Sequence, residues 1–324
     1  MDITNDIRGS RVVVTGGAGF VGSRIVAALV TAGADVLAID DFSTGLHASL
    51  PDSEPSLEVA EGSVLDFELI RDALEGCDVV IHAAARNIVV STRNPRDDFD
   101  VNIGGTLNVL LAAREVRPSR VVYTSSASIY GNPRYLPIGE DEPVNLLSPY
   151  AVSKFAGEGY CKAFYESYDL PTTVVRYSNV FGPGQTPANP YCGVVAKFFE
   201  AAIANEPPQI HGDGEQTRDY TFIDDAVDAT ISAAFSPRAP GQAYNVGTGR
   251  ETSVNQLARL ILEITGASVD PQHIDRRDID NIRRRVVNIE KIRRELRWTP
   301  EVTLERGLRK AHAWMREGAG LTPV

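Results

Sequence analysis

The chain has 324 residues, 43% hydrophobic and 23% charged, which is the composition of a globular protein large enough for one α/β unit or two domains. No apolar run approaches the roughly 18 residues of a membrane helix, and the polar N-terminus lacks a signal-peptide core, so we expect a cytoplasmic protein without a membrane partner. A net charge of −11 argues against nucleic acid as the main partner, and the scattered three cysteines and five histidines predict no disulfide framework and no metal site.

Short β-branched runs alternate with longer helical stretches through the first half of the chain. We predict strands at 11–15, 35–40, 78–82, 120–125 and 172–177, with helices at 19–33, at 97–116 and after Pro149. An alternation of this kind predicts an α/β fold with a doubly wound parallel (Rossmann) sheet and right-handed crossovers. The strands read as continuously apolar because such a sheet is buried on both faces.

The composition of the sequence changes after Tyr177. The stretch 178–193 is rich in Pro, Gly and Asn and predicts a long ordered loop, a kind of segment that is usually functional. Shorter elements follow, ending in an amphipathic segment at 304–315. We therefore expect one domain at 1–177 that also receives about 221–246, and a smaller α/β domain that consists mainly of 178–324.

A glycine-rich turn, TGGAGFVG, lies between the first strand and the first helix. Gly16 permits the tight turn, Gly19 lets the backbone approach a pyrophosphate, and Gly22 lets the helix pack on the strand. The free N–H groups and positive dipole end of the helix favour a phosphate. Together with the strand and the helix, this turn predicts a dinucleotide site that also includes Phe20 and Val21.

An acidic residue, Asp40, ends the second predicted strand, at the position where a carboxylate accepts hydrogen bonds from an adenosine ribose. A negative charge there repels a 2′-phosphate, which favours NAD over NADP as the cofactor. Asp41 is the alternative for the same role. The rest of this turn completes the predicted cofactor contacts, namely Phe42, Ser43, Thr44 and Gly45.

The motif SPYAVSK places Tyr150 and Lys154 at i,i+4 spacing, on one face of the helix after Pro149. Upstream, Ser125, Ser126 and Ser128 follow a strand and lie near the carboxyl edge of the sheet, where ligands bind. At ~5 Å and an effective dielectric of ~20, a cation stabilises a phenolate by ~3 kcal/mol, on the order of two pKa units. A positively charged nicotinamide nearby would add to this shift, so we expect Tyr150 to exchange protons near neutral pH while a serine hydroxyl holds the substrate oxygen.

Nearly the whole chain, from VTGGAGFVG (14–22) through GDGEQTRDYTFIDD (212–225) to LRWTPEVTLERGL (296–308), resembles a known family. It is similar to extended short-chain dehydrogenase/reductases of the nucleotide-sugar epimerase group, such as UDP-glucose 4-epimerases. The resemblance implies that Ser126 and Tyr150 bind and deprotonate the C4 hydroxyl of the sugar. It also implies that Lys154 holds the nicotinamide ribose, and that His82 is a strand-end residue rather than a ligand.

The resemblance implies further contacts. For the cofactor these are Ser63, Val64, Ala83, Ala84, Ala85, Asn102, Ser125, Tyr150, Lys154 and Tyr177, and for a nucleoside-diphosphate sugar they are Ser126, Ser128, Tyr150, Asn179, Val194, Arg218, Arg277 and Asp280. Two departures from the family matter. Ser63-Val64 stands where Asp-Ile is frequent, and the stretch 279–288 carries one extra residue, which leaves open the residue that gates the sugar pocket.

The predicted function is an NAD-dependent nucleotide-sugar 4-epimerase that acts through a transient 4-keto sugar. Its substrates would be UDP-glucose and UDP-galactose, their N-acetyl forms, or UDP-uronic acids. A nucleotide-sugar 4,6-dehydratase is the alternative, but such enzymes carry Thr-Asp-Glu where this chain has Ser126-Ala127-Ser128, so the acid and base for elimination are missing. A UDP-glucuronate decarboxylase and a non-catalytic NAD-binding module remain open as well.

The resemblance also implies a homodimer, in which the helices before the serine strand and after the tyrosine pair between two subunits. Small residues in these helices would permit close contact, although they could equally pack on the sheet. They are Gly104, Gly105, Ala112, Ala113, Ala156 and Gly157.

Overall fold

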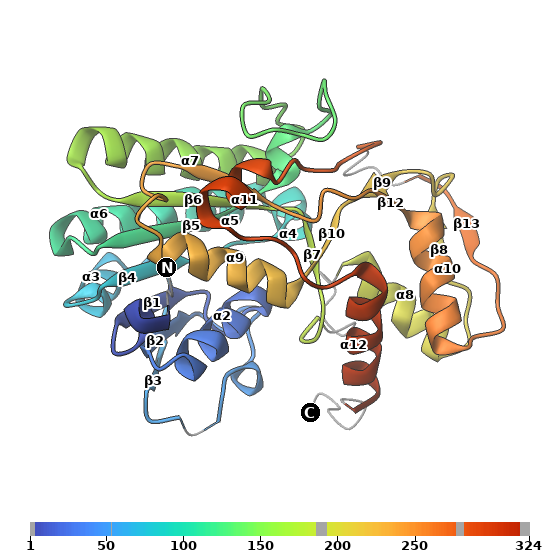
Figure 1. The fold of residues 1–324 in the computed structure, drawn as a ribbon, viewed down its shortest axis with the longest axis horizontal. Coiled ribbons are helices and arrows are strands. Elements are labelled where there is room, and N and C mark those ends of the chain that lie inside the picture. Colours follow the sequence, from blue (N-terminus) through green and yellow to red (C-terminus); the bar gives the residue numbers. More distant parts are fainter. Residues whose placement is uncertain (1–3, 53, 186–192, 277–281, 318–324) are drawn as a thin grey trace.

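The computed structural model describes residues 4–52, 54–185, 193–276 and 282–317. Its centre is a parallel seven-stranded sheet with the order β11-β6-β5-β4-β1-β2-β3 (Figure 1). The strands are β1 (Arg11–Thr15), β2 (Asp35–Asp40), β3 (Leu57–Glu61), β4 (Val79–His82), β5 (Arg120–Ser126), β6 (Thr172–Tyr177) and β11 (Ala243–Val246). The prediction of a doubly wound parallel sheet is confirmed.

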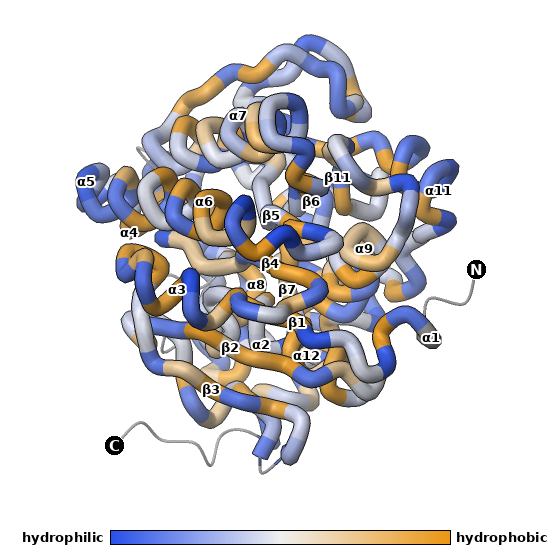
Figure 2. Tube along the Cα trace, turned by 90° about the vertical axis from the view of Figure 1, so that its left-hand side faces the viewer, coloured by the Kyte–Doolittle hydropathy of each residue, from blue (hydrophilic) through white to orange (hydrophobic). Residues whose placement is uncertain are grey.

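Helices cover both faces of this sheet, so its inner strands are buried on both sides. Val12 and Val14 of β1 face α2 (Phe20–Thr31) and α9 (Ile223–Phe235), whereas Val13 faces the layer of α3 (Phe67–Leu74), α6 (Thr106–Val116) and α7 (Pro149–Tyr168). Figure 2 shows hydrophobic segments gathered around the strands and hydrophilic ones on the outer turns. The alternation of neighbouring valines between two cores follows from the period of two in a strand.

Two elements differ from the sequence-based expectation. Strand β3 (Leu57–Glu61) was not predicted, because it is a half-exposed edge strand without a continuous apolar run. The single helix expected at 97–116 consists of α5 (Pro95–Asp98), a π-helical stretch at Phe99–Gly105 and α6, and it follows α4 (Ile88–Arg93). The hydroxyl of Thr106 donates to the carbonyl of Asn102, and such side-chain competition for a backbone carbonyl accompanies irregular helix.

After β6 the chain builds a smaller α/β part, at the right of Figure 1. Its helices are α8 (Val194–Ile203), α10 (Val254–Thr265) and α12 (Leu304–Glu317). Its strands pair two by two, as β7 (Asn179–Phe181) with β10 (Tyr220–Phe222), β8 (Gln209–His211) with β13 (Gln272–Ile274), and β9 (Thr217–Arg218) with β12 (Thr252–Ser253). Strand β7 lies inside the stretch that was predicted to be a loop, so that prediction is wrong for 179–181.

The remaining elements are short or join the two parts. They are α1 (Thr4–Ile7), α11 (Glu290–Leu296) and the single 3₁₀ turns at His47–Ser49 and Ala127–Tyr130. The chain returns to the large sheet through β11, which pairs in parallel with β6. Among the described helices, none combines the length and the apolar character that crossing a membrane requires.

Candidate functional site

The glycine-rich turn is closed tightly onto its surroundings. Gly16 has a φ of +69°, and a Cβ there would lie 2.6 Å from the backbone nitrogen of Ala84. A Cβ on Gly22 would overlap the carbonyl oxygen of Gly16, so the start of α2 packs directly on the turn. Gly19 is the N-cap of α2 and leaves the helix N-terminus without a side-chain cap. Gly16 and Gly22 therefore need glycine, as the motif predicts, and the turn leaves backbone N–H groups for an anion.

Asp40 lies buried under the next loop. One of its carboxylate oxygens accepts a hydrogen bond from the backbone N–H of Ala18 at 2.9 Å, and the other accepts one from Phe42 at 2.9 Å. Burial raises the pKa of Asp40, against these hydrogen bonds. Asp41 is more exposed; although burial acts in the opposite direction, hydrogen bonds from Ser43 and the nearby Arg86 charge hold its pKa low. Asp40 therefore joins the glycine turn to the loop at 41–45, which also contains Phe42, Ser43, Thr44 and Gly45.

The tyrosine and lysine of SPYAVSK come together as predicted. The Ser148 hydroxyl caps α7 by accepting from the N–H of Ala151 at 3.1 Å, and Pro149 occupies the first helical turn. This start directs half-buried Tyr150 and buried Lys154 toward the end of β5, where Ser126 lies. The Lys154 ammonium lies 6.0 Å from the centre of the Tyr150 ring.

The proton affinity of Tyr150 differs from the expectation. Burial raises its pKa to about 12, against a hydrogen bond with Ser126 and the positive charge of Arg285. Burial lowers the pKa of Lys154 to about 8, although Asp98 and Glu158 act to raise it. The predicted two-unit lowering of the Tyr150 pKa by Lys154 is wrong for the protein alone, because desolvation of the phenolate outweighs the opposing effects of Ser126 and Arg285.

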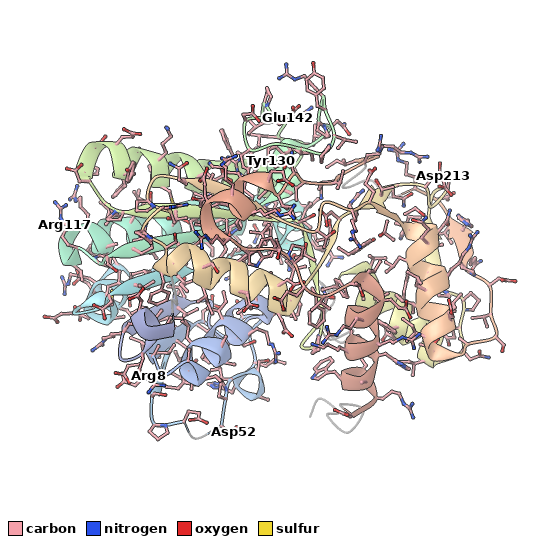
Figure 3. All side chains as sticks on the ribbon, in the orientation of Figure 1. Arg8, Asp52, Arg117, Tyr130, Glu142 and Asp213 are labelled. Atoms are coloured by element: carbon pink, nitrogen blue, oxygen red, sulfur yellow. The ribbon has the colours of Figure 1, made fainter. Side chains whose placement is uncertain are left out.

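Behind this cluster lies a buried ion pair that the sequence reasoning missed. The carboxylate of Glu158 accepts hydrogen bonds from Nη2 of Arg176 at 2.7 Å and from its Nε at 3.0 Å. It also accepts a hydrogen bond from the hydroxyl of Ser125. Arg176 donates in addition to the hydroxyl of Tyr130 at 2.7 Å, the residue labelled in Figure 3 below the loop that carries Glu142. Ser125 is thus engaged with α7. The sequence signal that could have pointed to this ion pair is the position of Glu158 four residues after Lys154, on the same face of the helix.

Asn102 connects the site to a second buried acid, Asp98. Its side-chain amide accepts from the N–H of Arg86 at 2.7 Å and donates to the Arg86 carbonyl at 3.0 Å, and it reaches Ser153 at 3.1 Å. Asp98 accepts hydrogen bonds from Asn102 at 2.6 Å and from Ser153 at 2.9 Å. Asn102 therefore supports the backbone after β4 and links it to α7.

The other residues expected around the cofactor lie along the same edge of the sheet. Ala83 donates its N–H to the carbonyl of Thr15 at 3.0 Å, and the Ala83–Ala85 segment runs beside the glycine turn. The hydroxyl of Ser63 accepts from the N–H of Leu65 at 3.2 Å, and Val64 is buried. Tyr177 ends β6, but its hydroxyl pairs with Thr230 of α9 at 2.5 Å.

The residues expected to bind substrate lie on several separate elements, and two of them are outside the described part of the chain. The buried hydroxyl of Ser128 has no hydrogen-bond partner within the described part of the chain. Asn179 pairs with the Tyr220 strand, and half-buried Val194 begins α8. Buried Arg218 donates to the backbone carbonyl of Ile282 at 2.9 Å. The predicted contacts Arg277 and Asp280 lie outside the described residues.

Of the three consecutive arginines at 283–285, one has a buried side chain. Arg283 pairs with Asp213 (labelled in Figure 3) at 2.8 Å, and Arg284 pairs with Glu251, both on the surface. Arg285, in contrast, is 6% exposed, and its charge acts on Tyr150. The sequence analysis named Arg277, which lies outside the described residues, and did not single out Arg285, because a run of arginines carries no signal of which side chain is buried.

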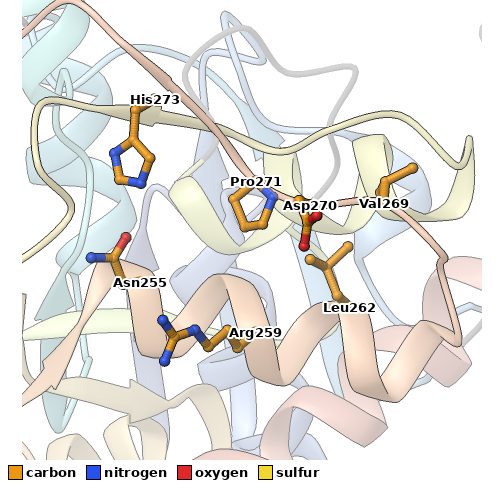
Figure 4. A pocket seen from close by; sticks show the side chains of 7 residues that line it. All are labelled: Asn255, Arg259, Leu262, Val269, Asp270, Pro271 and His273. Atoms are coloured by element: carbon orange, nitrogen blue, oxygen red, sulfur yellow. The ribbon is translucent and has the colours of Figure 1, made fainter.

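A pocket elsewhere on the surface does not belong to this cluster. It lies between α10 and the segment 269–273 on the smaller part, as Figure 4 shows. Its lining contains none of the predicted site residues; it consists of Asn255, Arg259, Leu262, Val269, Asp270, Pro271 and His273.

The residues present fit a dinucleotide cofactor. Side chains are excluded from the turn at Gly16 and Gly22, the first turn of α2 is open to an anion, and an acid ends β2. The Ser126, Tyr150 and Lys154 side chains lie two strands away, at the end of β5, on the same edge. A ligand that reaches from β2 to β5 across β1 and β4 would therefore touch both groups.

Comparison with known proteins agrees with this geometry. The family model "NAD dependent epimerase/dehydratase family" matches residues 12–247. The chain is 39% identical to a UDP-glucose 4-epimerase of Mycolicibacterium smegmatis, over 94% of this chain and 98% of the relative. An epimerase structure from Methanothermobacter thermautotrophicus is 37% identical with a TM-score of 0.95, covering 99% of this chain and 96% of that one.

A Thermotoga maritima UDP-glucose 4-epimerase with UDP-glucose is 35% identical with a TM-score of 0.91, covering 95% of this chain and 99% of that one. These likenesses extend over the large sheet and the smaller part alike. The sheet order, the glycine turn and the family match lead to one conclusion. The chain belongs to the NAD-dependent epimerase/dehydratase family.

Proposed function

We propose that this protein is an NAD-dependent nucleotide-sugar 4-epimerase, with UDP-sugars as substrates. The observation that carries the proposal is the cluster of Ser126, Tyr150 and Lys154 at the edge of the sheet that also bears the glycine turn. When bound, NAD supplies reversible hydride transfer at a sugar carbon. The Gly16 turn would hold its diphosphate, Asp40 its adenosine ribose and Lys154 its nicotinamide ribose.

Tyr150 is the proton carrier in this proposal. In its phenolate form Tyr150 takes the proton of the C4 hydroxyl, and the phenol so formed later returns it, while Ser126 holds the same oxygen. The charge of Arg285 supports the phenolate form, against the cost of burial. Because the proton and the hydride both return to the sugar, the reaction has no net redox change. The sugar passes through a 4-keto form.

The residues around the serine cluster favour epimerisation over elimination of water. The turn after β5 reads Ser126-Ala127-Ser128, so it offers hydroxyls and no carboxylate. Two buried acids of this region already have partners, Glu158 in Arg176 and Asp98 in hydrogen bonds from Asn102 and Ser153. A 4,6-dehydratase needs a free acid and base at this place.

We further propose which part of the chain binds which ligand, where the protein acts and how it assembles. Residues 1–177 with about 221–246 bind the cofactor, and the rest of 178–324 mainly binds the nucleotide and sugar, with Asn179 and Arg218 near the diphosphate. The protein acts in the cytoplasm. It forms a homodimer through α6 and α7, where Val152 and Phe155 expose 46% and 36% of their surface.

Four of the six small residues that were expected to support this interface have another place, whereas Gly104 borders open space. Ala112 and Ala113 are fully buried in the core, and a Cβ on Gly105 or Gly157 would overlap Val64 or Tyr123. These four residues pack inside the protein's own core, so the larger exposed side chains of α7 would form the contact. Light scattering at micromolar concentration tests the dimer, and a monomeric mass would contradict it.

The reaction is tested with a UDP-sugar deuterated at C4. We expect a C4 epimer of unchanged mass that retains the label, read by mass spectrometry and NMR. Loss of water with the label at C6 would identify a dehydratase, and loss of carbon dioxide from a uronic acid would identify a decarboxylase. Parallel incubation with dTDP-, GDP- and CDP-sugars tests the choice of uridine.

A further inference from the structure

Arg86 lies in the loop after β4, and its guanidinium makes three contacts with other segments. Its Nη1 donates to the hydroxyl of Ser43 at 2.6 Å, and its Nη2 lies 3.2 Å from a carboxylate oxygen of Asp41. Its Nε donates to Asp97 of α5 at 2.9 Å. A single side chain therefore connects the loop after β4, the loop after β2 and α5.

The position of this bridge follows from the strand order. Strand β1 lies between β2 and β4, and the glycine turn follows β1. A side chain that reaches from the loop after β4 to the loop after β2 must cross the carboxyl end of β1. Ala84 already lies against Gly16. A dinucleotide on this sheet edge crosses the same place, so the bridge spans the entrance to the cofactor site.

The inner end of the bridge is rigid. The side-chain amide of Asn102 holds both the N–H and the carbonyl of Arg86, and it is itself held by Asp98 and Ser153. The far end is also ordered, because Asp41 accepts hydrogen bonds from the N–H and the hydroxyl of Ser43. The bridge therefore has two fixed supports and one long side chain between them.

The contacts themselves are reversible. The side chains of Arg86, Asp41 and Asp97 are 17%, 29% and 32% exposed, so water can replace each contact when the side chain swings out. Planar guanidinium–carboxylate hydrogen bonds are strong for their size, whereas solvent exposure weakens them. This combination suits a side chain that keeps the two loops connected most of the time and releases them at intervals.

We propose that Arg86 is a strap that closes over the bound NAD and slows its exchange with solvent. The inference rests on the proposed NAD chemistry, since a reaction that returns the hydride to the same sugar requires the cofactor to stay in place. Arg86 acts by holding two loops together. It is a positioning residue, and no part in proton transfer is assigned to it.

The test compares cofactor exchange in Arg86→Gln, Asp97→Asn and the control Arg96→Gln. Arg96 is a neighbouring arginine whose side chain is 78% exposed, and its ion pair with Asp100 is long, at 3.8 Å. NADH release is followed by its fluorescence after mixing with excess NAD, and association by stopped flow. We expect Arg86→Gln to raise both rates about tenfold, equivalent to about 1.4 kcal/mol, Asp97→Asn to raise them less, and Arg96→Gln to match wild type.

Equal release rates in Arg86→Gln and Arg96→Gln would overturn the strap, and so would an unchanged association rate, because a gate affects both directions. If Arg86→Gln does not fold, Asp97→Asn decides, and a wild-type rate in that variant rejects the proposal. A protein that retains NAD but forms no C4 epimer contradicts the proposed function alone. The two proposals therefore fail on different measurements.

Discussion

The ammonium of Lys154 donates a hydrogen bond to the backbone carbonyl of Thr124 at 2.9 Å. The lysine of α7 is thereby fixed to the strand that carries Ser125 and Ser126. It also lies over the ring of Tyr123, 5.0 Å from its centre. A buried cation in this position keeps its charge only while the surrounding acids support it.

Turnover should fall as the pH rises through about 8, because burial lowers the pKa of Lys154 to about 8 and the ammonium is lost above it. Asp98→Asn removes a negative charge that raises this pKa, so the alkaline limb should move to lower pH. Asp100→Asn, an exposed acid two residues away, is the control. A pH–rate profile at saturating substrate measures both, and coincident limbs in Asp98→Asn and wild type would remove Asp98 from this role.

Replacing Tyr150 by Phe should lower turnover by about 10²–10⁴, the usual range for loss of a general acid–base group. The ring stays in place on α7, so the fold and NAD binding should be retained, as circular dichroism and cofactor titration would show. Single-turnover assays give the size of the loss. Turnover close to wild type would exclude Tyr150 as the proton carrier.

Asp40→Ala should weaken NAD binding and reduce the preference for NAD over NADP. It removes the ribose acceptor, and it also releases the N–H groups of Ala18 and Phe42 that the carboxylate holds. Titration with both cofactors measures the change. Unchanged affinities in Asp40→Ala would mean that Asp40 only orders the turn, and Asp41→Ala would then be the next variant to titrate.

Protein stability should depend on pH through His82. Burial and the charge of Lys154 lower the pKa of this histidine to about 3, while an unfolded histidine titrates at about 6.5. Below pH 6.5 the unfolded state binds the proton and the folded state does not, so the free energy of unfolding falls as the pH falls toward 3.

At pH 5 this loss amounts to about 2 kcal/mol relative to pH 7. Urea denaturation at both pH values measures it. His82→Gln should show a smaller difference between the two pH values than wild type, and exposed His273→Gln should behave as wild type. The same pH difference in His82→Gln would assign the acid lability to other groups.

Much of the fold could be predicted because its signals are local. The valine runs of β1 and β6, the glycines between β1 and α2, and the Ser148-Pro149 start of α7 each specify structure within a few residues. The same patterns place Tyr150 and Lys154 one turn apart. Period and capping chemistry depend on neighbours in the chain, so the sequence alone was sufficient for most of the parallel sheet and for this pair.

Other features depend on contacts that no local pattern contains. Arg86 meets Asp41 across 45 residues, and Arg176 pairs with Glu158 from another element. Desolvation decides the pKa of Tyr150, and desolvation exists only after packing. Tertiary structure therefore decided which charges are buried, whether Arg285 lies inside the protein and how Arg86 connects the loops after β2 and β4. The sequence by itself determined most of the sheet, the glycine turn and the helix that carries Tyr150 and Lys154.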